Sequence, residues 1–172
     1  YVGLIEPWKG FHYLIEAFER LRMPDTELVL WGGCGTRAVT RYMQQKLALN
    51  SNISMRPVAI RTAGLENVYA KSSVLVLPSL ADGFGYVVGE AMACGVPVVV
   101  TANTGAADLV TEGVNGFIVP PGDTNAITER LRHLAQSPSL VREMGRAARE
   151  TMRKRSSKQM AHDYASRVLA LI

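Results

Sequence analysis

A lysine at the expected start of a helix is the first residue of this sequence that could take part in chemistry. Lys9 and Gly10 end the loop Gly3–Gly10, which follows a short apolar run and precedes an amphipathic stretch. A helix N-terminus carries unpaired N–H groups and a partial positive charge, and a lysine adds a full charge, so the loop predicts a phosphate site. A solvated Lys9 beside a turn-forming Gly10 fits the sequence equally well.

The strongest indication of a ligand site comes from two carboxylates, those of Asp82 and Glu90. Glu90 is the only charged residue between Asp82 and Asp108, in a stretch of small and apolar residues. An ionised carboxylate is costly to bury unless it is hydrogen-bonded. We therefore expect a buried Glu90 that accepts bonds from a hydroxylated ligand or from protein donors, rather than a rim glutamate that reaches solvent. Asp82 could contact the same ligand or cap the next helix, and Gly83 and Gly85 would let the backbone approach a ligand.

Two further loops are also predicted to connect a strand to a helix. Thr104 and Gly105 stand where a second anion site could form at a helix start, although capping by Asn103 or Thr104 explains the same residues. The loop Gly32–Thr36 contains Gly-x-Gly but lacks the third glycine of the dinucleotide-binding pattern. A tight turn is therefore favoured there over a ligand contact.

Apolar runs and helical patterns alternate along the chain, which predicts the elements that must position these loops. Such alternation is typical of an α/β fold, here a Rossmann-like, doubly wound parallel sheet of about six strands with helices on both faces and a helical C-terminus. Ligands of such sheets bind beyond the carboxyl ends of the strands. The expected strands are Val2–Ile5, Glu27–Trp31, Ile53–Arg56, Val74–Leu77, Val96–Val100 and Phe117–Val119, of which the fourth and fifth are the most apolar and should be central.

Helices are expected between these strands and throughout the last third of the sequence. Asp123 is placed to cap the first of the C-terminal helices, and the third should turn its apolar face toward a neighbouring domain. The predicted helices are Phe11–Arg22, Arg37–Leu49, and those beginning near Leu65, Gly85, Thr104, Asp123, Pro138 and Ser156 or Ser157.

The composition suits one globular domain with an anionic partner, because the 172 residues carry a net charge of +4. No apolar run approaches the ~18 residues of a membrane-spanning helix, and no signal peptide is present, so a soluble, cytoplasmic protein is predicted. Two distant cysteines support neither a disulfide nor a metal site. A basic stripe on the second C-terminal helix is either a solvated face or a peripheral contact with an anionic membrane; it comprises Arg142, Arg146, Arg149 and Arg153.

Taken together, the loops resemble the C-terminal, donor-binding domain of GT-B glycosyltransferases of family 4 (glycosyl transferases group 1), over nearly the whole chain. The resemblance implies a retaining hexosyltransferase that uses a nucleotide sugar such as a UDP- or GDP-sugar, with a glycan, lipid or other acceptor, and without a bound metal, a cofactor or nucleic acid. Residues 1–172 would form the donor domain, with the N-terminal acceptor domain absent, so the chain alone is expected to be inactive. The matching segments are Gly3–Gly10, Asp82–Glu90, Glu90–Val99 and Gly113–Asp123.

The resemblance also implies a role for each matched residue. Lys9 would bind the donor diphosphate, Asp82 would contact the sugar, and Glu90 would hold the ribose hydroxyls, the two carboxylates being the catalytic pair. The remaining positions would line the donor: Gly3, Gly10, Gly83, Phe84, Gly85, Thr104 and Gly105.

Two positions depart from the family pattern. The chain has Leu4 where the family usually carries an arginine, and Asp82 where the family usually carries a glutamate. These departures leave open an alternative, a degenerate module that binds a nucleotide sugar or a partner without transfer. A nicotinamide-dependent oxidoreductase is disfavoured, because the glycine fingerprint of that class is incomplete.

Overall fold

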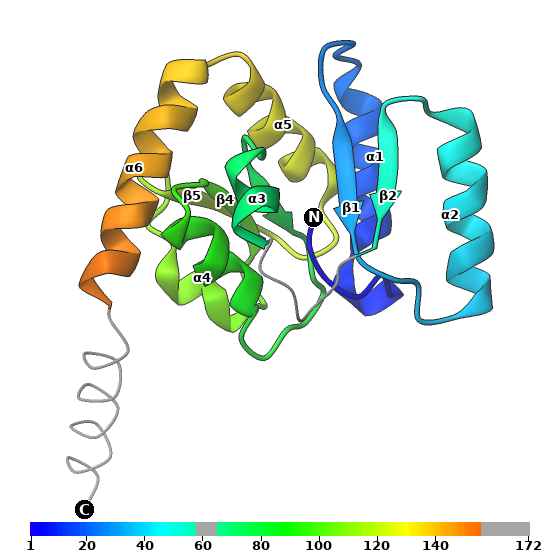
Figure 1. Ribbon diagram of the computed structural model, residues 1–172, viewed down its shortest axis with the longest axis horizontal. Helices are drawn as coiled ribbons and strands as arrows, with labels where there is room; N and C mark the ends of the chain where they lie inside the picture. Colours follow the sequence, from blue (N-terminus) through cyan, green and yellow to red (C-terminus); the bar gives the residue numbers. More distant parts are fainter. Residues whose placement is uncertain (58–64, 156–172) are drawn as a thin grey trace, which may run out of the picture.

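The computed structural model describes residues 1–57 and 65–155 as an α/β fold (Figure 1). Its strands form two parallel sheets, one with the order β1–β2 and one with the order β3–β4–β5, and helices flank both. The predicted fold class is confirmed, although the described residues contain fewer strands than the six expected. The strands are β1 (Leu28–Trp31), β2 (Ile53–Arg56), β3 (Leu75–Leu77), β4 (Val98–Thr101) and β5 (Gly116–Val119).

The expected first strand forms isolated bridges in place of a continuous ladder. Val2 bridges to Trp31 and Ile5 bridges to Cys34, both in the parallel sense. Between them Gly3 donates its N–H to Trp31 O at 2.9 Å but has a φ of 144°. That backbone conformation breaks the regular pleat, so the segment lies along β1 without becoming a strand.

Most of the predicted helices are present, with small shifts in their limits. The helix expected from Thr104 is instead a short 3₁₀ turn, η2, and the third C-terminal helix lies outside the described residues. Asp123 caps α5 as predicted, since its Oδ1 accepts the N–H of Ala126 at 2.9 Å. The helices are η1 (Pro7–Lys9), α1 (Phe11–Leu21), α2 (Arg37–Leu49), α3 (Leu65–Ala70), α4 (Tyr86–Ala93), η2 (Gly105–Leu109), α5 (Thr124–Ala135) and α6 (Pro138–Lys154).

The most apolar strands form the centre of the core. All residues of β3 and β4 are buried. Among the strands of the described residues, β4 alone has strand partners on both sides, so the expectation of a central strand is correct for β4 and wrong for β3, which is an edge of its sheet. Around this core α1 packs against α5, and α4 packs against α6. Among residues 1–57 and 65–155, no helix is both long and apolar enough to cross a bilayer.

Gly10 allows the first loop to approach the end of β3. It adopts a φ of 68° between η1 and α1, and a Cβ placed on it would lie 1.9 Å from the backbone oxygen of Pro78. Its N–H is also used, because it donates to Pro7 O at 2.9 Å. Gly10 is therefore required by the geometry of the fold.

We predict that Gly10→Ala lowers the free energy of unfolding by about 2 kcal/mol or more, because the substitution adds a clash to a left-handed backbone. Chemical denaturation of the purified chain measures this. Gly33→Ala is the matched control, since a Cβ at Gly33 meets nothing within 4 Å. Equal stability of the two variants would contradict the close approach.

Candidate functional site

Three loops meet at the carboxyl ends of the strands, and backbone hydrogen bonds join them. The loop before α1 contacts the loop after β3, where Leu80 N donates to Trp8 O at 2.8 Å. The loop after β3 contacts the loop after β4 twice, through Asp82 N to Asn103 O at 3.1 Å and Gly105 N to Asp82 O at 3.2 Å. This is the edge at which parallel α/β sheets bind ligands. The predicted site residues of these loops are thus brought together.

An ion pair lies at this junction. Lys9 Nζ is 2.5 Å from Asp82 Oδ2, and the two side chains are only 17% and 11% exposed. Ser79 Oγ also lies 3.5 Å from the same carboxylate oxygen. The alternative in which Asp82 caps the next helix is wrong, because Gly85 occupies the cap position of α4. The structure therefore provides a cation and a carboxylate in mutual contact, each with little exposure to water.

Glu90 is exposed at the surface of α4, which corrects the expectation that it is buried. The opposite face of the helix carries Val88, Ala91 and Met92 into the core, and this leaves Glu90 toward solvent. Its carboxylate nevertheless has a protein donor, since Tyr69 OH donates to Glu90 Oε2 at 2.7 Å. No pattern in the sequence pointed to Tyr69 as this partner, because Tyr69 lies on a different helix, α3.

The loop after β4 uses its polar groups within the protein. Thr104 is buried, and its hydroxyl donates to Thr101 O at 3.2 Å, so its side chain makes no capping bond to η2. A Cβ on Gly105 would lie 2.4 Å from Gly83 O, which explains the glycine by close packing. Gly83 itself has open space around its Cα and is exposed. The backbone of Gly83 is therefore open to the approach of a ligand.

Apolar side chains form an exposed rim beside the ion pair. The rings of Phe84 and Tyr86 are in tilted contact with centroids 4.7 Å apart, and both residues are exposed. Trp8 is also exposed, with Lys9 Nζ 4.2 Å from the centre of its ring. Leu4, which replaces the usual arginine, is 49% exposed. Position 4 therefore has room for a longer side chain.

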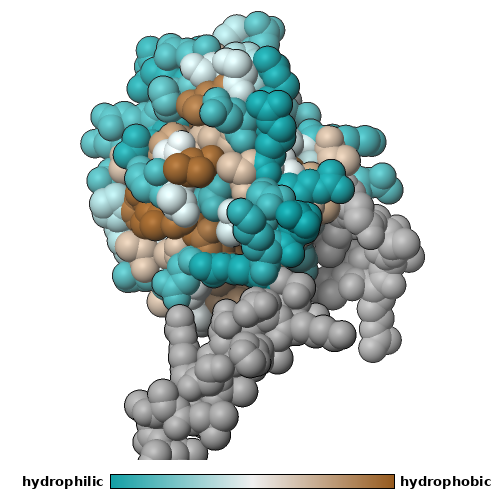
Figure 2. Space-filling model, turned by 90° about the vertical axis from the view of Figure 1, so that its left-hand side faces the viewer, coloured by the Kyte–Doolittle hydropathy of each residue, from teal (hydrophilic) through white to brown (hydrophobic). Residues whose placement is uncertain are grey.

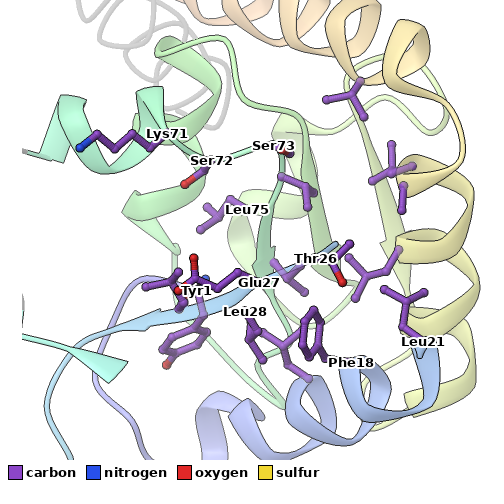
Figure 3. Close-up of a pocket in the computed structure, with 18 of the residues that line it drawn as sticks. Tyr1, Phe18, Leu21, Thr26, Glu27, Leu28, Lys71, Ser72, Ser73 and Leu75 are labelled. Carbon is purple, nitrogen blue, oxygen red and sulfur yellow. Dashed lines mark hydrogen bonds between the residues drawn. The ribbon is translucent and has the colours of Figure 1, made fainter. Parts of the chain in front are cut away.

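A cavity of about 690 Å³ lies away from this site. It is lined mainly by apolar residues, among them Tyr1, Phe18, Leu28 and Leu75 (Figure 3). Its lining includes none of Lys9, Asp82 and Glu90. The size of the cavity therefore does not identify the functional site.

The basic stripe of α6 is exposed as predicted. Figure 2, which views the side of the molecule where α6 lies, shows a mostly hydrophilic surface with small apolar patches. Arg153 is engaged by two hydrogen bonds to the Glu150 carboxylate at 2.8 and 2.9 Å. Hydrogen bonding from Arg153 lowers the pKa of Glu150 to about 2. The charge at this end of the stripe is therefore partly neutralised.

Comparison with known proteins identifies the class. The chain matches the glycosyl transferases group 1 family over residues 1–151 and belongs to that family. The capsular polysaccharide biosynthesis glycosyltransferase CapM of Staphylococcus aureus is 34% identical over 164 residues, covering 93% of this chain and 42% of CapM. A D-inositol 3-phosphate glycosyltransferase of Kribbella flavida is 32% identical over 162 residues, covering 87% of this chain and 38% of that protein. The chain spans about two-fifths of the length of these relatives.

Solved structures agree with this assignment. Anabaena HepE in complex with UDP has a TM-score of 0.83 and 25% identity, over 99% of this chain and 48% of HepE. The C-terminal domain of LpcC, a glycosyl transferase group 1 family protein of Francisella tularensis, shares the fold with a TM-score of 0.81 and 22% identity, over 89% of this chain and 84% of that one. The fold is thus that of part of a GT-B glycosyltransferase.

Proposed function

We propose that this chain is the donor-binding, C-terminal domain of a retaining family 4 glycosyltransferase, which transfers a hexosyl group from a nucleotide sugar to a glycan, lipid or other acceptor. The observation that carries the proposal is the Lys9–Asp82 pair at the meeting point of the three loops. Several parts of the proposal rest on the family resemblance alone: retention of configuration, a reaction without a metal or cofactor, and the acceptor class.

The ion pair suits a site for a diphosphate and a sugar. Lys9 is held at the carboxyl ends of the strands with most of its surface removed from water, which strengthens its attraction to an anion that displaces Asp82. In the reaction we propose, Lys9 meets the negative charge that develops on the departing nucleoside diphosphate, and such electrostatic stabilisation lowers the barrier. Asp82 then contacts the sugar, and Glu90 contacts the ribose.

A uridine nucleotide is the donor class we favour. HepE, which shares 25% identity with this chain, has been solved with UDP and also with UDP-glucose. The match covers 99% of this chain but only 48% of HepE, and a donor domain within a two-domain enzyme would produce this difference.

Transfer should need a second domain. An acceptor must be held beside the donor carbon, and such orientation is worth effective molarities of ~10⁵ M or more. We therefore propose that the 172-residue chain binds donor and transfers no sugar by itself. The exposed arginines of α6 support a peripheral contact of the enzyme with the cytoplasmic face of an anionic membrane.

We predict that UDP binds the chain more tightly than uridine and that Lys9→Ala removes most of the difference. A charge-assisted bond contributes on the order of 1.5–3 kcal/mol, so the loss in UDP affinity should be roughly tenfold or more. Isothermal titration calorimetry with both ligands tests this. Lys46→Ala is the matched control, because Lys46 is also paired with a carboxylate, that of Glu19 on α1. Equal affinities for UDP and uridine would contradict the proposed function.

A second prediction concerns the missing arginine. Leu4→Arg should strengthen UDP binding, because it adds a cation on the loop that carries Lys9. The substitution should be tolerated by the fold, with a change of about 0.5 kcal/mol or less, since Leu4 is 49% exposed. Titration with UDP and chemical denaturation measure the two effects. Leu49→Arg, at a leucine that is 81% exposed on α2, controls for the added charge. An equal gain in both variants would show that net charge, and not the loop, is responsible.

A further inference from the structure

Tyr69 is a buried phenol whose hydroxyl is directed to a surface carboxylate. The residue lies on α3, is 2% exposed and packs with the hydrophobic core. Buried hydroxyl groups require a hydrogen-bond partner. Tyr69 OH finds this partner in Glu90 Oε2, at 2.7 Å, on α4. The bond thus joins two helices at the one charged residue of α4.

The bond restricts how Glu90 can move. A glutamate on an exposed helix face ordinarily samples several rotamers. Tyr69 is fixed by its packed ring, and burial, followed by its hydrogen bond to Glu90, raises the pKa of the Tyr69 hydroxyl, so the group remains a proton donor at neutral pH. Each carboxylate can accept several hydrogen bonds. Glu90 held in this way retains capacity to accept hydroxyl groups from a ligand.

We propose that Tyr69 is a positioning residue, which holds the Glu90 carboxylate in the orientation that receives the two ribose hydroxyls of a nucleotide. This inference rests on the proposed function and adds to it a residue from outside the loops of the site. A side chain that is already held in place loses no conformational entropy when the ligand binds, and this favours binding.

The experiment compares UDP with 2′,3′-dideoxy-UDP, which lacks the two hydroxyls. In the unmodified chain UDP should bind more tightly than the dideoxy compound. Tyr69→Phe keeps the packed ring and removes the donor, so UDP should bind about three- to tenfold more weakly while the dideoxy compound is unaffected. Tyr42→Phe, which removes a tyrosine hydroxyl from α2, should change neither affinity.

The pairing with Glu90 is tested by combining variants. Glu90→Gln should weaken UDP binding by itself, and adding Tyr69→Phe to it should cause no further loss, because the two residues act as one unit. If Tyr69→Phe is not stable enough for titration, Glu90→Asp is a second way to break the hydrogen bond. The shorter side chain withdraws the carboxylate from Tyr69, and it should also weaken UDP but not dideoxy-UDP.

The outcomes separate the two claims. If Tyr69→Phe weakens both nucleotides equally, or neither, or if its loss adds fully to that of Glu90→Gln, Tyr69 acts only on the fold and the positioning role is wrong. If the unmodified chain binds UDP and dideoxy-UDP equally well, or binds neither, the assignment of Glu90 to the ribose fails, and with it this part of the proposed function.

Discussion

The contact between Lys9 and Asp82 is the interaction on which the rest of the site depends. The two residues are 73 positions apart in sequence, and they meet because the segments that carry them end at the same edge of a parallel fold. Their approach requires Gly10 to pass against Pro78 without a side chain. Backbone bonds then hold the loop of Asp82 against the loop that follows β4. Packing in the fold thus decides where the charges lie.

A partly buried ion pair is a suitable resting state for an anion site. Desolvation makes an unpaired lysine costly, and the carboxylate offsets that cost in the absence of ligand. A diphosphate that enters must compete with Asp82 for Lys9. Once bound, its negative charge replaces that of Asp82 in balancing the charge of Lys9. In the proposed reaction Asp82, no longer paired with Lys9, then contacts the sugar. Lys9 is the only cation in the loop Gly3–Gly10, so the balance between Asp82 and the ligand at this loop depends on Lys9.

The sequence predicted what local pattern controls and missed what depends on packing between helices. The limits of α2 and β2 agree with the prediction, since amphipathic spacing and a bounded apolar run define them. Both charged partners of the ion pair were named from the loops, but their mutual contact was not. The isolation of Glu90 among apolar residues suggested burial. Its exposure follows from the rotation of α4, and its tyrosine partner lies on another helix, so neither could be read from spacing alone.

In the proposed site, Lys9 binds the anion in competition with Asp82. Titration of Asp82→Asn with UDP tests this competition most directly. The substitution leaves Lys9 in place without its compensating charge. We predict that the ligand-free variant is less stable than the unmodified chain and that UDP binds to it more tightly, because the nucleotide no longer competes with a carboxylate. UDP affinity that is unchanged or weaker in Asp82→Asn, in a variant that remains folded, would contradict the account.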